Sequence, residues 1–594
     1  MRPIRDMLEE RISAALDRVS GQSGSAAMVR PVADARFGDY QANGVMALAK
    51  RMGTNPRKLA EQATGQLGLD DLCLAPEVAG PGFINLRLRP EFLGRAMKEI
   101  RDDSKRLGIE RAAAAKTVVV DYSGPNIAKQ MHVGHLRSTI IGDCICRILE
   151  GLGHKVIRQN HIGDWGTQFG MLINLMKERG ITPTKGTETA SLAYLENLYK
   201  DAKKRHDEDE QFARTSGTYV VNLHHSSAGR IGNDDTKDIW RDITDISLSE
   251  INSLYKELGV LLTDADIRGE SAYNDDLPKV VEDLRRAGLA VESEGAVCVF
   301  PEGFKNKEGE PLPFIIQKTD GAFLYATTDL AALRYRVAEL KADEIVYVTD
   351  ARQAQHFAML FAVARKAGWA KETTELVHVT FGTMLGTDGK PFKTRSGETV
   401  KLKELLEEAV QRARGVVEAK NPELPEDQKQ NIARAVGIGA VKYSDYSNNR
   451  DSDYVFSFDK MLAMEGNTAP YMQYAYARVR SIERKAETRG IAVDAEIAGL
   501  SDPTPQEPAE IELAKQIVRY GEAIAMAAQD CRPNYLTAYL YDLAQKFSNF
   551  YNACPVLDAE GPTRARRLLL CDLTARTIRH GLSELLGIEV VDQM

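Results

Sequence analysis

The sequence lacks any long apolar run. Among its 594 residues, no stretch approaches the roughly 18 to 20 consecutive apolar residues that a membrane helix requires. The first stretch, MRPIRDMLEERISAALDRV, spaces its apolar residues like an amphipathic helix and carries Asp6, Glu9 and Glu10, so it also lacks the continuous apolar segment of a signal peptide. These absences argue against a membrane protein and against export. We expect a cytoplasmic protein with no membrane partner.

Paired cysteines and an excess of basic charge are also missing. The seven cysteines are odd in number, scattered and without CxxC spacing, which supports neither a disulfide framework nor a cysteine zinc site and fits a reducing cytoplasm. The formal net charge of -8, from 77 basic and 85 acidic side chains, argues against a protein that coats nucleic acid by general electrostatics. Any RNA-binding site must therefore be a local basic surface.

The length and the order of sequence patterns predict a multidomain chain, because folding units usually span roughly 100 to 200 residues. From Lys116, short β-rich runs such as TVVVDY and DEIVYVTD alternate with amphipathic stretches, which is typical of a parallel sheet with crossover helices. After about Tyr454, helical periodicity dominates. We predict a small α+β N-terminal domain, an α/β Rossmann-type parallel-sheet domain, a connecting segment and an all-α C-terminal domain. The expected ranges are 1–110, 111–400, 401–454 and 455–594, with insertions near 183–238 and 291–323.

The sharpest chemical feature is the join between a strand and a helix in TVVVDYSGPNIAKQMHVGHLRSTIIGD. Unpaired backbone N–H groups and the positive end of the helix dipole favour a phosphate at the start of such a helix, and Gly134 leaves room for a nucleotide. His132 and His135 lie three residues apart and would face one ligand. A coincidental surface pair of histidines is the simpler alternative. A zinc site has less support, because no third ligand follows at suitable spacing, and we expect no metal site.

Two segments carry a resemblance to a known family. PNIAKQMHVGHLRSTIIGD resembles the nucleotide-binding HIGH signature of class I aminoacyl-tRNA synthetases in its arginyl form. Later in the chain, GTMLGTDGKPFKTRSGETVKL resembles the mobile KMSKS loop of that family, with Lys393, Thr394, Arg395 and Ser396 in its place. The resemblance implies that ATP binds to His132, Gly134, His135 and the loop residues Lys393, Thr394 and Arg395, and that His132, His135, Lys393 and Arg395 act in catalysis.

Arg395 departs from the family pattern, in which a second lysine occupies this position. A lysine ammonium is compact and flexible, whereas a guanidinium is bulkier and forked, so the exchange need not preserve function. Lys129, three residues before His132, is our candidate for the missing ammonium at the triphosphate. The alternative is that Lys129 is a solvated charge on a loop.

Recognition of arginine requires planar acceptors that face a guanidinium group. In GAFLYATTDLAALRYR, Tyr325 and Asp329 lie four residues apart at the expected start of a helix and so share one face. The resemblance places Tyr325, Asp329 and Gln353 around the arginine side chain and Asn126 near its α-amino group. It also places His161, in HIGDWGTQFG, near the bound amino acid. The alternatives are an ordinary carboxylate at a helix start for Asp329 and a turn histidine for His161.

The C-terminal stretch EGNTAPYMQYAYARVRSI mixes aromatic rings with cations at helical spacing, a combination that can stack on bases and hold phosphates. It resembles the helical anticodon-binding domain of arginyl enzymes, and GDYQANGVMALAK resembles the extra N-terminal domain that those enzymes use against the outer corner of tRNA. A tyrosine-rich core helix remains the alternative. The residues assigned to tRNA are Tyr40, Gln41, Tyr471, Tyr474, Arg478 and Arg480.

The resemblance implies an arginine–tRNA ligase that uses ATP as a substrate with Mg²⁺, forms arginyl-adenylate and transfers arginine to a tRNA with an arginine anticodon. It also implies that activation depends on bound tRNA, and we expect a monomer. Three alternatives stay open: a synthetase for another amino acid, a small-molecule nucleotidyltransferase that shares the HxGH site, and a non-catalytic RNA-binding relative.

Overall fold

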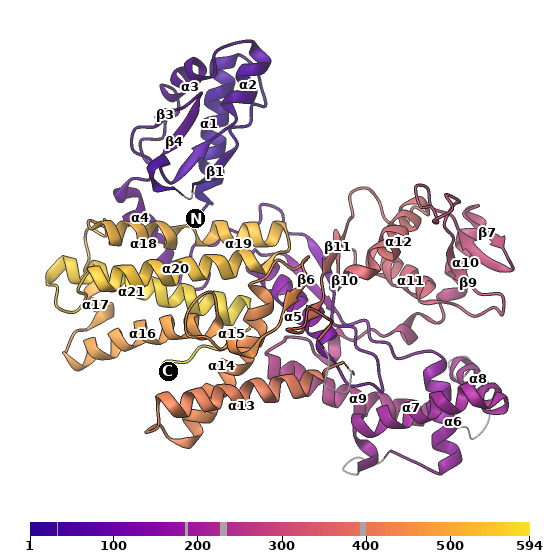
Figure 1. Cartoon of the computed structure of the whole chain (residues 1–594). Helices are drawn as coiled ribbons and strands as arrows, with labels where there is room; N and C mark the ends of the chain where they lie inside the picture. The colour runs from indigo at the N-terminus through magenta and orange to yellow at the C-terminus, as the bar shows by residue number, and fades with distance from the viewer. Residues whose placement is uncertain (33, 184–187, 226–234, 393–398) are drawn as a thin grey trace.

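The computed structural model describes residues 1–32, 34–183, 188–225, 235–392 and 399–594. Figure 1 shows the N-terminal domain standing away from a larger body, in which the central sheet lies between a helical bundle and two smaller lobes. No helix within the described ranges is long and apolar enough to cross a membrane.

The N-terminal domain packs helices against one antiparallel sheet of order β1-β2-β4-β3. Its strands are β1 (Val29–Pro31), β2 (Tyr40–Ala42), β3 (Glu77–Ala79) and β4 (Phe83–Leu86), and its helices are α1 (Ile4–Ser20), η1 (Ala35–Phe37), α2 (Val45–Met52) and α3 (Pro56–Thr64). Helix α4 (Pro90–Asp102) follows and packs against α18 (Pro508–Val518) of the C-terminal bundle. In α1 the buried residues Ile4, Leu8, Ile12 and Leu16 recur every four positions, so one stripe of the helix faces the core. This is the predicted small α+β domain.

The central sheet is parallel throughout and has the order β11-β10-β5-β6. It consists of β5 (Thr117–Asp121), β6 (Lys155–Gln159), β10 (Glu344–Asp350) and β11 (Glu375–Phe381). Alternate residues of β5 enter different cores: Val118 and Val120 pack in the cluster with helix α5 (Val133–Gly151), and Val119 packs with α11 (Tyr325–Ala338) and α12 (Ala354–Lys366). Helices therefore cover both faces, as a Rossmann-type sheet requires.

Two lobes interrupt this sheet. The first contains α6 (Thr167–Arg179), η2 (Glu188–Ala190), α7 (Leu192–Glu208), α8 (Glu210–His225) and α9 (Thr236–Leu258). Its range includes the charged stretch expected as an insertion, where α7 still buries Leu192, Leu195, Leu198 and Ala202 at helical spacing. The second lobe contains η3 (Asp264–Asp266), η4 (Glu270–Tyr273), α10 (Leu277–Arg286) and the antiparallel sheet β7 (Ala290–Ser293), β8 (Ala296–Val299) and β9 (Phe314–Gln317).

The remainder is almost entirely helical. The segment expected as a connection holds α13 (Leu402–Lys420) and α14 (Glu426–Tyr446), which pack against each other, and β12 (Met384–Leu385) pairs with β13 (Tyr454–Val455). The C-terminal bundle follows with α15 (Phe458–Met461), α16 (Ala469–Thr488), α17 (Val493–Ala498), α18 (Pro508–Val518), α19 (Tyr520–Gln529), α20 (Pro533–Ala553), α21 (Gly561–Arg579) and a final π-helical turn, η6 (His580–Leu585). This helical bundle agrees with the all-α C-terminal domain predicted from the sequence.

Tyr40, one of the residues assigned to tRNA, joins the N-terminal domain to the C-terminal bundle. Tyr40 is fully buried, its hydroxyl donates to the Glu522 carboxylate at 2.8 Å, and the Arg519 guanidinium lies 5.4 Å from its ring centroid. Gln41 is half-buried and donates to Asn85 Oδ1 at 2.7 Å. The placement of Tyr40 in an RNA-binding surface is therefore wrong, because its ring joins two domains and leaves no face exposed for a base.

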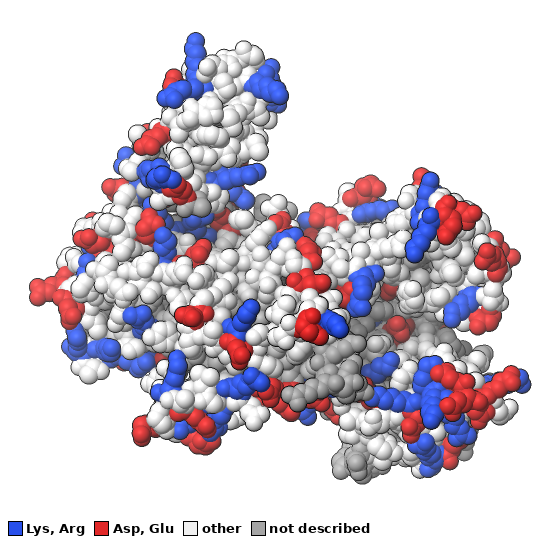
Figure 2. All heavy atoms as spheres, in the orientation of Figure 1, with Lys and Arg blue, Asp and Glu red and all other residues white. Residues whose placement is uncertain are grey.

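Acidic and basic groups are interspersed over the face shown in Figure 2. The mixture agrees with the formal net charge of -8 and with the expectation that any RNA site is local.

Candidate active site and anticodon pocket

A strained turn redirects the chain between β5 and α5. Ser123 and Gly124 both have positive φ, 73° and 53°, and a serine in this region is strained because it carries a Cβ. Hydrogen bonds hold it in place: its N–H donates to Ser138 Oγ at 2.9 Å, and its Oγ lies 2.8 Å from Thr139 Oγ1 and 2.7 Å from the Tyr255 hydroxyl. The turn brings the start of α5 to the carboxyl end of the strand, where open α/β sheets bind ligands.

The two histidines fold back on the backbone at the start of α5. His132 Nδ1 accepts the Gly134 N–H at 3.0 Å, and His135 Nδ1 accepts the His132 N–H at 3.1 Å. A neutral ring whose Nδ1 accepts a hydrogen bond carries its proton on Nε2, so each imidazole presents an Nε2–H donor. Burial lowers the pKa of His132, and burial together with His132 lowers the pKa of His135 to about 3. Both side chains are therefore neutral donors near neutral pH.

The expectation of unpaired backbone N–H groups at this helix start is wrong for its first three residues. The Val133 N–H donates to the Val400 carbonyl at 3.1 Å, the Gly134 N–H to His132 Nδ1, and the His135 N–H to the His132 carbonyl at 2.8 Å. A Cβ at Gly134 would lie 2.8 Å from His132 Cε1. Gly134 thus makes room for the His132 ring.

A cavity of about 400 Å³ opens beside these histidines. Its lining residues are Asn126, Lys129, Gln130, His132, His135, Glu196, Lys200, Thr399 and Lys401. Three lysines face one glutamate there, and Lys401 Nζ lies 2.6 Å from both carboxylate oxygens of Glu196. The Lys129 ammonium lies 4.8 Å from the Tyr199 ring centroid. A cavity with a surplus of ammonium groups and neutral N–H donors matches a polyphosphate.

The KMSKS-like residues Lys393, Thr394, Arg395 and Ser396 lie outside the described residues. The segment that follows them is anchored beside the histidines: Lys401 pairs with His132 as an antiparallel bridge, and the Leu402 N–H donates to the Met131 carbonyl at 2.9 Å. Residues 401 and 402 therefore lie next to the HIGH-like motif.

A second group of polar residues lies around Asp329. His356 Nε2 is 2.7 Å from Asp329 Oδ2, and His161 Nε2 is 3.9 Å from Oδ1. The ring of Tyr325, which is 65% exposed, lies 5.2 Å from the His356 ring, so His356 contacts both residues of the predicted pair. Gln353 is exposed at the end of η5 (Ala351–Gln353), just before α12.

Asn126 lies beside the turn that holds His161. Its backbone forms a parallel bridge with Gly163, and a Cβ at Gly163 would lie 2.3 Å from Asn126 Oδ1. Because Asn126 also lines the cavity near the histidines, this turn connects the basic cavity with the group around Asp329.

Two carboxylates near Asp329 were missed in the sequence. Burial, Asp164 and Asp329 raise the pKa of Glu270 to about 7, and burial raises the pKa of Asp164. Asp164 accepts hydrogen bonds from the Ser271 N–H at 2.9 Å and the Ser271 hydroxyl at 2.6 Å. The neighbouring negative charges that raise the pKa of Glu270 favour a bound cation. Glu270 and Asp329 lie far apart in the sequence, so no spacing pattern indicated that they would be close in the fold.

The residues assigned to RNA on α16 divide into two groups. Tyr474 and Arg478 line a cavity of about 440 Å³, and the Arg478 guanidinium lies 4.2 Å from the Tyr551 ring centroid. Tyr471 instead packs edge-on against Tyr541, with ring centroids 5.9 Å apart, and Arg480 pairs with Glu483 and Asp592. The full lining of the cavity is Asn421, Leu424, Tyr474, Ala477, Arg478, Ser481, Arg484, Lys485, Tyr551, Gln593 and Met594.

Comparison with known proteins identifies the family. Residues 99–458, more than half of the chain, match the model for the catalytic domain of class I tRNA synthetases of the arginine type. The chain belongs to the class I arginyl-tRNA synthetases. Residues 6–88 match the arginyl-tRNA synthetase N-terminal domain, and residues 472–594 match the DALR anticodon-binding domain. The family and the fold class predicted from the sequence are confirmed.

Relatives match over the full length. The arginine–tRNA ligases of Laribacter hongkongensis and Chromobacterium violaceum are 49% and 50% identical over 591 residues, covering 100% of each chain. Among solved structures, the arginyl-tRNA synthetase of Plasmodium falciparum has a TM-score of 0.83 at 30% identity, and that of Thermus thermophilus 0.81 at 27%, again covering 100% of each chain.

Proposed function

We propose that this arginyl-tRNA synthetase attaches L-arginine to its tRNA in two steps, through arginyl-adenylate. The observation that carries the proposal is the pairing of two opposite environments on the carboxyl side of the central sheet. A cavity with lysines and neutral imidazole donors lies beside α5, and a group of carboxylates lies around Asp329. The first suits ATP, and the second suits a guanidinium. The full-length relatives named arginine–tRNA ligases support this assignment.

In the first step, a carboxylate oxygen of arginine attacks the α-phosphorus of ATP and pyrophosphate leaves. The Nε2–H groups of His132 and His135 donate to phosphate oxygens as charge grows on them, and such donors act by stabilising the transition state. Mg²⁺ enters with ATP, since it is usually held by substrate phosphates and a few carboxylates. Within the described residues, no three His, Cys, Asp or Glu side chains are grouped to hold a metal ion.

The same geometry orients the amino acid. Asp329 and Glu270 accept from the guanidinium, Tyr325 and Gln353 border it, and Asn126 lies where it can reach the α-amino group. His161, between Asp329 and the turn beside Asn126, faces the bound arginine. A neutral or basic pocket would not select a guanidinium, because a carboxylate is needed to provide negative charge together with two coplanar acceptors.

The loop residues Lys393, Thr394 and Arg395 are assigned to the triphosphate by their resemblance to the KMSKS signature. We assign the missing ammonium to Lys129, which lines the same cavity as the two histidines. In the second step, the 2′-OH of the terminal tRNA adenosine attacks the adenylate carbonyl and AMP leaves.

The tRNA partner carries an arginine anticodon, which we place at the cavity beside Tyr474 and Arg478. An exposed ring and a guanidinium suit an unstacked base and its phosphate. We propose further that arginine is activated only when tRNA is bound, and that the enzyme acts as a monomer in the cytoplasm.

The test is arginine-dependent ATP–pyrophosphate exchange with and without tRNA bearing an arginine anticodon. Exchange that requires tRNA supports the whole proposal, and exchange with arginine alone removes the tRNA requirement. The absence of exchange under both conditions contradicts the assigned activity. A panel of amino acids in the same assay tests specificity, and sedimentation equilibrium tests the monomer.

A further inference from the structure

The last residues of the chain connect the two sites described above. The segment 584–594 begins in η6 and runs from helix α5, which carries His132 and His135 at its start, to the cavity beside Tyr474 and Arg478. Gln593 and Met594 line that cavity.

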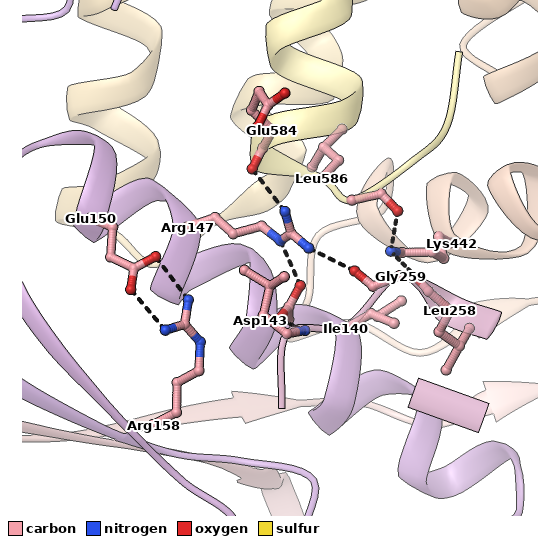
Figure 3. Close-up of polar contacts among 12 residues, drawn as sticks. Ile140, Asp143, Arg147, Glu150, Arg158, Leu258, Gly259, Lys442, Glu584 and Leu586 are labelled. Carbon is pink, nitrogen blue, oxygen red and sulfur yellow. Dashed lines mark hydrogen bonds and ion pairs between the residues drawn. The ribbon is translucent and has the colours of Figure 1, made fainter. Parts of the chain in front are cut away.

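The first part of this segment is bonded to α5 (Figure 3). Arg147 of α5 donates to the Glu584 carbonyl at 3.2 Å and to the Gly259 carbonyl at 2.6 Å, while its Nε pairs with Asp143 at 2.7 Å. The Tyr446 hydroxyl of α14 lies 2.9 Å from the Ile140 carbonyl of α5 and 3.3 Å from the Leu586 carbonyl. These contacts attach the C-terminal segment directly to the helix that presents His132 and His135.

A buried lysine completes the attachment. The Lys442 ammonium, which is fully buried, donates to the Leu258 and Gly587 carbonyls, both at 2.6 Å. Gly587 has φ of 60°, and a Cβ there would lie 2.8 Å from Lys442 Nζ. A side chain at position 587 would displace the Lys442 amino group, whose buried N–H donors require these two carbonyl acceptors.

The second part of the segment is bonded to α16, the helix that carries Tyr474 and Arg478. Gln473 Nε2 donates to the Glu589 carbonyl at 2.7 Å, and the Tyr476 hydroxyl donates to Asp592 Oδ1 at 3.2 Å. Arg484 donates to the Asp592 carbonyl at 3.0 Å. Several hydrogen bonds therefore attach the C-terminal segment to α16, the helix that lines the cavity. A shift of α16 when the cavity is occupied would move this segment.

We propose that the C-terminal segment 584–594 positions α5, and with it His132 and His135, according to whether RNA occupies the cavity beside Tyr474 and Arg478. This inference rests on the proposed function and gives the tRNA requirement a physical route. Tyr446, Lys442 and Tyr476 act as positioning residues, since none of them touches the substrates. Coupling between two sites in one protein typically changes affinity by about 5- to 150-fold.

The test uses the full-length enzyme and compares Tyr446→Phe with Tyr443→Phe. Both tyrosines are fully buried on α14, but the Tyr443 hydroxyl contacts Asn467 and Thr537, outside the C-terminal segment. The quantity measured is the factor by which saturating tRNA raises arginine-dependent exchange, together with the tRNA dissociation constant. We expect Tyr446→Phe to lower that factor about fivefold or more, with tRNA binding unchanged, and Tyr443→Phe to preserve it.

A second variant covers the case in which Tyr446→Phe does not fold. Tyr476→Phe removes only the bond to Asp592 at the other end of the segment, and we expect the same loss of stimulation. The double variant should lose no more than the larger single loss, because both hydroxyls act on one route.

The outcomes separate this inference from the proposed function. If tRNA stimulates the wild type and equally stimulates Tyr446→Phe or, where that variant does not fold, Tyr476→Phe, the inference is overturned and the proposed function stands. Equal losses in Tyr446→Phe and Tyr443→Phe would also overturn it, since they would indicate a purely structural effect. A wild type that tRNA does not stimulate overturns both the tRNA requirement and the route.

Discussion

The ATP side and the arginine side of the candidate active site are built in opposite ways. The ATP side comes mainly from one stretch, the turn at Ser123 and the start of α5 at His132 and His135. The arginine side gathers Asp164, Glu270, Asp329 and His356 from four separate segments. A helix start can organise a phosphate site locally, whereas a pocket for a cation needs several carboxylates that one short segment does not provide.

The two sides also use burial differently. Burial lowers the pKa of both histidines, so they stay neutral and can donate to an anion without adding a positive charge. Burial and neighbouring carboxylates raise the pKa of Glu270, so this group becomes fully charged only above its pKa or when a cation binds. We therefore expect a substitution on the ATP side to change the kinetics for ATP, and a substitution on the arginine side to change the kinetics for arginine.

The largest effect is expected from Asp329→Asn. Removing the charge that we propose faces the guanidinium should cost roughly 3–5 kcal/mol, which lowers kcat/KM for arginine by a factor between about 10² and about 4 × 10³. Steady-state exchange at varied arginine and varied ATP measures it, with the KM for ATP as the internal control. An equal loss of kcat/KM for arginine and for ATP would contradict the division into two sides, because it would show that Asp329 serves the whole site.

His135→Ala tests the ATP side. The change removes an Nε2–H donor and the acceptor of the His132 N–H, and the loss of one such donor typically lowers kcat about 10²- to 10³-fold. Single-turnover adenylate formation measures it. The KM for arginine should stay close to that of the wild type. A variant in which only the KM for arginine changes would contradict the assignment of His135 to the ATP side.

Lys129→Met should reduce adenylate formation by about tenfold, the equivalent of one charge-assisted hydrogen bond of ~1.5 kcal/mol. The same single-turnover assay applies. Near-normal adenylate formation would assign the missing ammonium to another residue and return Lys129 to a solvated charge stacked on Tyr199.

The smallest effect depends on pH. Glu270, with its pKa raised to about 7, must lose its proton to bind a guanidinium, so the KM for arginine should fall as pH rises from 6 to 8. Glu270→Gln should raise this KM by about tenfold at pH 8 and hardly change it at pH 6, as loss of one charge-assisted hydrogen bond predicts. Titration of KM across this range measures it.

Asp329→Asn supplies the control for that titration. Because Asp329 contributes to the raised pKa of Glu270, its neutralisation should move the inflection to lower pH. An inflection that persists unchanged in Glu270→Gln would assign the pH dependence to another group.

Much of the fold was predictable because its signals are local. The alternation of β-rich runs with amphipathic stretches indicated the parallel sheet, and the four-residue spacing of Tyr325 and Asp329 indicated a shared helix face, on which both contact His356. The unpaired amides expected at α5 were wrong because His132 and the Val400 carbonyl take them. Tyr40 was misplaced because burial against Glu522, 482 positions away in sequence, leaves no local pattern.

The sequence by itself determined the family, the domain order and the position of the HIGH-like motif, because these depend on residues that are neighbours along the chain. Only the tertiary structure decided that Glu270 joins Asp329, that Tyr40 joins two domains, and that the C-terminal segment reaches α5. Each of these depends on contacts between segments remote in sequence, where burial and charge act through space.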